Sequence, residues 1–129
     1  GDKSKVHASQ REFGYDTVDI DRDGILEYFI LPMSKNFCNE FGCQAYILSN
    51  NMDLISSIRA GAPPICFSKE MTNGYRDIEL YSGGAIRVLK ADKNGKYPEE
   101  PHTLEARESI SRQCETMFGG AFPKVRYEY

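Results

Sequence analysis

The sequence predicts a mainly β fold, an antiparallel sheet made of β-hairpins, with one C-terminal α-helix packed on it (α+β by strict counting). Short runs of β-branched and aromatic residues, separated by turn residues, predict the strands. A stretch at residues 104–118 without Gly or Pro, with apolar residues at helical spacing, predicts the helix. At 129 residues the chain suits a single domain over 1–129, in which we expect 1–12 to be a flexible N-terminal leader.

The expected strands follow one another along most of the chain. The clearest covers residues 25–31 and is closed by Pro32. Asn50 and Asn51 form a turn between strands at 43–49 and 54–58. Pro63 and Pro64 are expected to break the chain before a short buried strand at 65–67. Further strands are expected at residues 13–18, 75–81, 85–91 and 122–129.

The helix is expected over residues 104–118 because its apolar residues would lie on one face. These residues, at i, i+4, i+7 and i+8, are Ile110, Cys114, Met117 and Phe118. Thr103 can cap the first turn, and Gly119 with Gly120 would end the helix. On this face Cys114 would point inward, towards the strand that carries Cys66.

Composition and charge exclude several classes of protein. The hydrophobic fraction of 40% and the charged fraction of 27% are ordinary for a globular protein. Sixteen basic and nineteen acidic residues give a net charge of -3, and no Lys/Arg cluster marks a nucleic-acid surface. No apolar run is long enough to span a membrane. The first ten residues are polar, so we expect that a signal peptide has been removed.

Four cysteines are expected to form two disulfides, Cys38–Cys43 and Cys66–Cys114. A zinc site is an alternative, but neither C-x2-C knuckle that it would prefer is present. Four free thiols in a cytosolic protein are a second alternative. Disulfides would indicate an oxidising compartment, either periplasmic or extracellular. Because the chain has no N-glycosylation sequon, we expect the periplasm.

Residues 19–27 form the sharpest motif, a D-x-D-x-D-G-x-x-E loop. Calcium needs several oxygen ligands at short range, and a glycine permits the tight turn. The loop is not an EF-hand, because position twelve is Ile30 rather than Glu. It resembles the calcium loops between strands of integrin-type FG-GAP repeats. That resemblance implies a structural calcium held by these residues: Asp19, Asp21, Asp23, the carbonyl of Ile25, and Glu27. A solvated acidic turn without an ion is the alternative.

Catalytic residues are not indicated, and we expect a binding protein rather than an enzyme. His7 and His102 are the only neutral-pH bases, and a Cys–His hydrolase would also need a free thiol. Paired carboxylates for glycoside hydrolysis stay open, since acidic residues are plentiful. No phosphate-binding or dinucleotide fingerprint occurs. Eight tyrosines favour a protein partner, although many would be half-buried strand residues.

Two segments are candidates for contact with that partner. Ser82, Gly83 and Gly84, next to Tyr81, form either a plain hairpin turn or a small tip that can enter a narrow cleft. The loop at residues 69–76, which ends with Tyr75 and Arg76, could form a second contact patch.

Three features together carry a family resemblance over residues 16–97: the acidic loop, the close Cys38–Cys43 pair, and an N-G-Y-R-D segment at 73–77. In this order they resemble a group of small bacterial periplasmic proteins, some of which resemble immunity proteins against type VI secretion amidase effectors. The resemblance implies a protein that plugs the Cys–His cleft of a peptidoglycan amidase with the tip at residues 82–84. The alternative is a calcium-stabilised periplasmic module that binds a cell-wall glycan or another hydrolase, such as a lysozyme.

Overall fold

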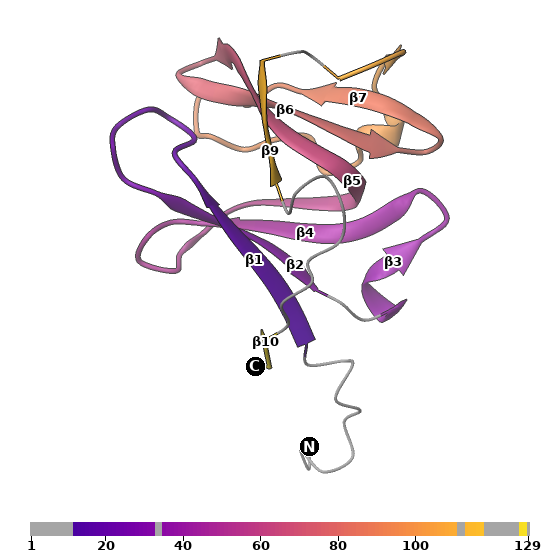
Figure 1. Cartoon of the computed structure of the whole chain (residues 1–129), viewed down its shortest axis with the longest axis horizontal. Coiled ribbons are helices and arrows are strands. Elements are labelled where there is room, and N and C mark those ends of the chain that lie inside the picture. Colours follow the sequence, from indigo (N-terminus) through magenta and orange to yellow (C-terminus); the bar gives the residue numbers. More distant parts are fainter. Residues whose placement is uncertain (1–11, 33–34, 111–112, 118–126, 129) are drawn as a thin grey trace.

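The computed structural model describes residues 12–32, 35–110, 113–117 and 127–128, and their fold is the expected antiparallel β architecture (Figure 1). The strands are β1 Glu12–Val18, β2 Glu27–Pro32, β3 Cys38–Asn39, β4 Gly42–Leu48, β5 Leu54–Thr72, β6 Tyr75–Ser82, β7 Ala85–Leu89, β8 Ala106–Arg107, β9 Cys114–Thr116 and β10 Tyr127–Glu128. Two 3-10 turns, η2 Lys35–Phe37 and η3 Pro101–Thr103, interrupt them. Among the described residues, no helix has the length and apolar character that crossing a membrane requires.

Two of the segments expected near the termini fall partly on residues that are not described. Residues 1–11 of the expected leader lie outside the described part of the chain, and Glu12 already belongs to β1. Of the strand expected at 122–129, residues 127–128 form β10, which pairs with the start of β1. Residues 122–126 and 129 lie outside the described residues.

The sheet runs in the order β10-β1-β2-β4-β5-β6-β7-β8, with β3 paired to β4 and β9 paired to β5. The 19-residue strand β5 belongs to both halves of this path. Its first part pairs with β4, and its second part pairs with β6 and β9. We call β1, β2, β4, β10 and the first part of β5 the first layer, and the second part of β5 with β6–β9 the second layer.

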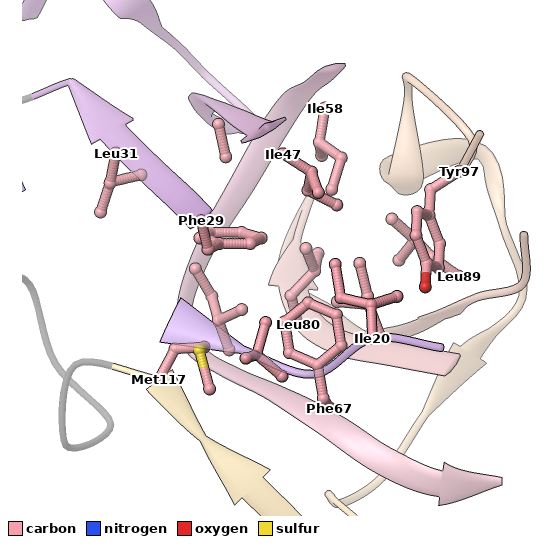
Figure 2. Close-up of a cluster of buried hydrophobic side chains, with 14 of the residues drawn as sticks. Ile20, Phe29, Leu31, Ile47, Ile58, Phe67, Leu80, Leu89, Tyr97 and Met117 are labelled. Carbon is pink, nitrogen blue, oxygen red and sulfur yellow. The ribbon is translucent and has the colours of Figure 1, made fainter. Parts of the chain in front are cut away.

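The core lies between the two layers. Phe29 and Ile47 contribute from the first layer, and Phe67 and Leu80 from the second, each with no exposed surface (Figure 2). The rings of Phe29 and Phe67 meet edge to face, with centroids 5.9 Å apart. In β4, buried and half-buried residues alternate along the strand, so one face of the first layer packs on the core and the other faces away from it.

Pro63 and Pro64 do not break the chain, contrary to the sequence-based expectation. β5 runs through them, and its pairing with β6 jumps from Ala62–Tyr81 to Ile65–Leu80. Proline has no backbone N–H to donate to a neighbouring strand, so it is tolerated where the register shifts. The two prolines therefore lie where β5 passes from the first layer to the second.

The predicted C-terminal helix at residues 104–118 is wrong. Among the described residues of this segment, 106–107 form β8 and 114–116 form β9, while 111–112 and 118 are not described. The backbone of Cys66, Phe67 and Ser68 is buried and needs hydrogen-bond partners on the side away from β6. β9 supplies them in an extended conformation, and this tertiary requirement outweighs the weak local preference for helix.

Both predicted disulfides are confirmed. Cys38–Cys43 links the paired strands β3 and β4. Cys66–Cys114 links β5 to β9 with a Cα–Cα distance of 5.5 Å. Of the residues that sequence reasoning placed on one helical face, Met117 does reach the interior, directly after strand β9, and is 1% exposed; Cys114 within β9 is half-buried.

We expect loss of the Cys66–Cys114 disulfide to destabilise the protein more than loss of Cys38–Cys43. The two bonds span 48 and 5 residues, and by loop-closure entropy they contribute about 4 and about 2 kcal/mol. Urea unfolding of Cys66→Ala/Cys114→Ala and of the control pair Cys38→Ala/Cys43→Ala measures this difference. Equal losses of unfolding free energy would contradict it.

Candidate functional site

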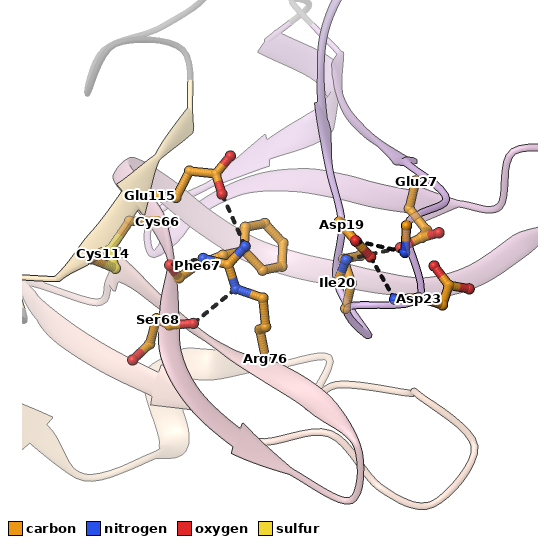
Figure 3. A network of polar contacts seen from close by, with 11 residues as sticks. Asp19, Ile20, Asp23, Glu27, Cys66, Phe67, Ser68, Arg76, Cys114 and Glu115 are labelled. Atoms are coloured by element: carbon orange, nitrogen blue, oxygen red, sulfur yellow. Dashed lines mark hydrogen bonds and ion pairs between the residues drawn. A yellow bond between two sulfur atoms is a disulfide. The ribbon is translucent and has the colours of Figure 1, made fainter.

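The acidic loop joins β1 to β2 and closes their hairpin, in which Val18 pairs with Glu27. Its turn is shaped by its own carboxylates. The Asp19 carboxylate accepts hydrogen bonds from the backbone N–H of Asp23 at 3.2 Å and of Gly24 at 2.9 Å (Figure 3). Gly24 has a φ of +86°, a backbone conformation that residues other than glycine rarely adopt. The sequence pattern therefore specifies this turn locally.

The loop is anchored to the rest of the fold through Glu27 and Ile20. Glu27 is only 7% exposed, and its Oε1 accepts the Ile20 backbone N–H at 2.9 Å. The Ile20 carbonyl in turn accepts the backbone N–H of Arg76 at 2.8 Å, at the start of β6. A buried carboxylate thus fixes the loop against the second layer.

Three of the five predicted calcium ligands come together. Asp19, Asp21 and Glu27 each offer a carboxylate oxygen, and these oxygens all lie within 4.8 Å of one another. Oδ1 of Asp21 is buried without a hydrogen-bond partner among the described residues. Asp23 and Ile25 line a cavity together with Asp21 and Glu27. Asp23 Oδ1, however, already accepts the Ile25 backbone N–H at 2.8 Å. The donor set consists of the hard oxygens that calcium prefers.

The negatively charged carboxylates in the loop repel one another. Burial raises the pKa of Asp21, and its hydrogen bond with Asp23 and the charge of Asp23 raise it further. Burial also raises the pKa of Glu27, with additional repulsion from the neighbouring aspartates, against the lowering effect of the Ile20 N–H. The Ile25 N–H lowers the pKa of Asp23. Two carboxylates are thus less stable when ionised, and a bound cation would relieve both.

A cavity of about 270 Å³ opens beside the loop. Residues from three other segments line it: Ser49, Asn50 and Ile55 from the β4–β5 turn and the strand after it, Asn94, Gly95 and Tyr97 after β7, and Tyr75 from β6. A side chain at position 95 would come within 2.9 Å of the Tyr75 ring, so glycine allows this close packing. Sequence reasoning missed Asn50, Asn94 and Tyr97, because only the tertiary fold brings their turns to the acidic loop.

The predicted contact tip, at the β6–β7 turn, is held from inside the fold. Ser82 has no exposed surface, and its hydroxyl donates a hydrogen bond to the Ala60 carbonyl. The backbone N–H of Gly83 donates to the Phe41 carbonyl at 3.0 Å. The Ser82 hydroxyl is therefore engaged within the protein rather than presented to a partner.

The accessible part of this tip consists of Gly84 and Tyr81. Gly84 is exposed, and Tyr81 is 40% exposed. Arg87 braces the turn from behind, since its guanidinium donates to the carbonyls of Ser82 at 2.9 Å and Gly83 at 3.1 Å. The tip is thus a braced hairpin turn with one aromatic side chain beside it.

Tyr75 and Arg76 lie at the opposite end of β6 from the tip. Tyr75 lines the cavity beside the acidic loop. Arg76 is 8% exposed, and its guanidinium donates to the carbonyls of Ser68 and Phe67, both at 2.9 Å (Figure 3). Its third contact is an ion pair with Glu115 at 2.9 Å. The structure therefore does not unite the predicted partner-binding residues in one patch, and Arg76 connects β6 to β5 and β9.

The structure offers no free thiol for the Cys–His hydrolase considered from the sequence. All four cysteines are in disulfides. His102 stacks on the ring of Phe41 with centroids 4.0 Å apart, and its Nδ1 is buried without a hydrogen-bond partner among the described residues. His7 lies outside the described residues.

The raised pKa values of Asp21 and Glu27 lead to a prediction about pH. The native state holds these protons more tightly than the unfolded chain does, so the two protonated carboxyl groups stabilise the native state at pH values below their ordinary pKa values of 3.8 and 4.5. This stabilisation is lost as the pH rises through the raised pKa values of the native state. In EDTA at neutral pH, we expect Asp21→Asn to raise the unfolding free energy by about 0.5 kcal/mol. The gain should disappear well below pH 3.8, where Asp21 is protonated in both states. Urea unfolding at several pH values measures it; a loss of stability at neutral pH would contradict the prediction.

Comparison of the chain with protein-family models, with curated proteins and with solved structures finds no match. Its function is therefore inferred from the acidic loop, the cavity beside it and the braced hairpin.

Proposed function

We propose that this protein is a periplasmic immunity protein that binds a peptidoglycan-degrading amidase effector and blocks its active-site cleft. The braced β6–β7 hairpin carries the proposal. Hydrogen bonds from Ser82, Gly83 and Arg87 hold the turn before any partner is present. A preorganised segment binds with a smaller loss of conformational entropy than a flexible one.

The chemistry of the tip suits a narrow cleft. Gly83 and Gly84 add no side-chain bulk, and Tyr81 offers an aromatic side chain of the kind that often anchors an interface. The two disulfides support an oxidising compartment, as expected for a protein that meets its target outside the cytoplasm. In this proposal the protein is a binder and carries out no catalysis.

We further propose that the acidic loop holds a structural calcium ion. The convergent oxygens of Asp19, Asp21 and Glu27 and the unpartnered Oδ1 of Asp21 support this role. The ion would also stabilise the contact between the loop and the second layer, because the Ile20 carbonyl in this loop accepts a hydrogen bond from the Arg76 backbone N–H in β6. Calcium would thus stabilise the hairpin of β1 and β2 against the second layer.

A second candidate function is a calcium-stabilised module that binds a cell-wall glycan or another hydrolase, such as a lysozyme. The cavity beside the acidic loop favours it. Asn50 and Asn94 contribute amides that can donate to and accept from sugar hydroxyls, and Tyr75 contributes an aromatic ring.

We expect millimolar calcium to raise the melting temperature. A ligand at a hundred times its Kd adds about 2.7 kcal/mol of stability, which amounts to several degrees in a domain of this size. Glu27→Gln should abolish most of the shift, whereas Asp53→Asn, an exposed acid outside the loop, should leave it intact. Differential scanning fluorimetry in EDTA, calcium or magnesium measures it. No shift in the wild-type protein would rule out the calcium site.

The immunity function is tested by inhibition of purified Cys–His peptidoglycan amidases. We expect nanomolar to micromolar inhibition of one of them, and a loss of at least about tenfold for Tyr81→Ala, as for an interface anchor. Leu26→Ala is the control, because Leu26 is exposed (51%, against 40% for Tyr81) and lies outside both candidate contact segments. Ser82 is unsuitable for this test, since its burial would make Ser82→Arg disrupt the fold.

The outcomes separate the two candidate functions. Equal inhibition by Tyr81→Ala and the wild-type protein would exclude the hairpin as the contact. No inhibition of any amidase, together with sedimentation with purified peptidoglycan or inhibition of a lysozyme, would favour the second candidate.

A further inference from the structure

Two cysteines and one glutamate converge within the second layer. Cys66 of β5 is the cross-strand partner of Glu79 in β6, so both side chains point to the same side of the sheet. Cys114 of β9 reaches the same place through its disulfide with Cys66 (Figure 3). One donor atom from each residue, two sulfurs and a carboxylate oxygen, lies within 4.8 Å of the other two. We call these three residues the Cys–Glu cluster.

The carboxylate of the Cys–Glu cluster is buried beside the disulfide. Glu79 is 1% exposed, and its Oε2 lies 3.9 Å from the Sγ of Cys114. A disulfide sulfur carries no proton, so it donates no hydrogen bond to this carboxylate. The guanidinium of Arg107, an exposed residue, forms an ion pair with the other oxygen, Oε1, at 3.6 Å. Because a buried charge needs compensation, a cation held between the sulfurs and Oε2 would be favourable there.

The distances and charges in the cluster suit a tetrahedral zinc ion. Zinc binds cysteine sulfur at about 2.3 Å and carboxylate oxygen at about 2.0–2.2 Å, so two of its ligands lie about 3.5–3.8 Å apart. The Oε2–Sγ distance of 3.9 Å is close to that separation. Two thiolates and one carboxylate carry three negative charges, which one zinc ion and the Arg107 guanidinium balance. Thiolate ligands select zinc over calcium and magnesium, which bind oxygen.

Contacts other than the disulfide keep the three ligands together. β9 pairs with β5 along all three of its residues. Met117, directly after β9, is 1% exposed in the core, and Glu115 within β9 is ion-paired with Arg76. Reduction of the disulfide breaks the S–S bond, which takes part in none of these contacts. The two sulfurs would therefore stay beside Glu79, and a preorganised set of ligands binds a metal at a smaller entropic cost.

We propose that the Cys–Glu cluster is a zinc site in the reduced protein, with the disulfide and the zinc-bound form as its two alternative states. A dithiol reductant supplies two electrons and two protons, which convert the disulfide into two thiols, while the reductant is oxidised to a disulfide. Zinc then binds both sulfurs and Glu79, and the two thiol protons are released. A water molecule completes the tetrahedron. This inference goes beyond the immunity function, because it needs neither a protein partner nor the acidic loop.

The test uses the full chain with Cys38→Ser/Cys43→Ser, so that the other cysteine pair cannot bind metal. The protein is reduced with dithiothreitol, freed of the reductant without oxygen, and titrated with Co²⁺ and then Zn²⁺. We expect one Co²⁺ per chain, with thiolate-to-cobalt charge-transfer absorption that one Zn²⁺ abolishes. The oxidised protein has no thiolate and should not show this absorption, so it is the blank for metal bound at the acidic loop.

A matched pair of variants tests the carboxylate. Glu79→Gln should weaken zinc binding by the reduced protein at least about tenfold, whereas Glu108→Gln, an exposed acid next to Arg107 in the sequence, should leave it unchanged. The melting temperature of each oxidised variant checks its fold. If Glu79→Gln does not fold, Glu79→Asp replaces it, because it keeps the negative charge but withdraws the carboxylate from the sulfurs. The same loss of affinity is expected.

Three outcomes would overturn the proposal. The first is a reduced protein without thiolate-bound metal, or with two chains on each metal ion. The second is equal zinc affinity with and without the Glu79 carboxylate. The third is a reduced chain that loses the circular dichroism of its β-sheet and does not regain it with zinc. Amidase inhibition is measured separately on the oxidised protein, so failure here is independent of failure of the immunity function.

Discussion

The buried guanidinium and backbone of Arg76 hold together segments that are far apart in the sequence. The side chain binds carbonyls of β5 and the carboxylate of Glu115 in β9. The backbone N–H reaches Ile20 in the acidic loop, and the backbone carbonyl accepts the Tyr97 hydroxyl. A charge removed from water must have its hydrogen bonds satisfied, so these neighbours have little freedom to move independently. Arg76 thus helps to fix the acidic loop, together with Glu27, and β9, together with the Cys66–Cys114 disulfide.

β6 connects the two regions for which a function is proposed. Its first residues, Tyr75 and Arg76, border the acidic loop and its cavity, and its last residues lead into the braced tip. Val88 and Ile86 of β7 pair with Glu79 and Tyr81 along this strand. A cation that stabilised the loop would therefore act on the same strand that ends at the proposed contact.

Sequence reasoning succeeded where the information is local. The turn around Gly24, the strand ending at Pro32 and the Cys38–Cys43 pair each depend on residues a few positions apart. It failed at residues 104–118, because the buried edge of β5 at Cys66 requires an extended partner, and helical spacing carries no information on that requirement. For the same reason the acidic cluster was predicted, whereas Asn94 and Tyr97, which reach it from another turn, were not.

The continuity of β5 has a consequence for how the protein unfolds. One continuous strand runs through both layers, so no linker allows one layer to move away while the other stays in place. The core residues between them, such as Phe29 and Phe67, would lose their contacts at the same time. We therefore expect the two layers to unfold as one cooperative unit, with the amide protons of β5 on both sides of Pro63 and Pro64 exchanging with solvent only when the whole domain opens.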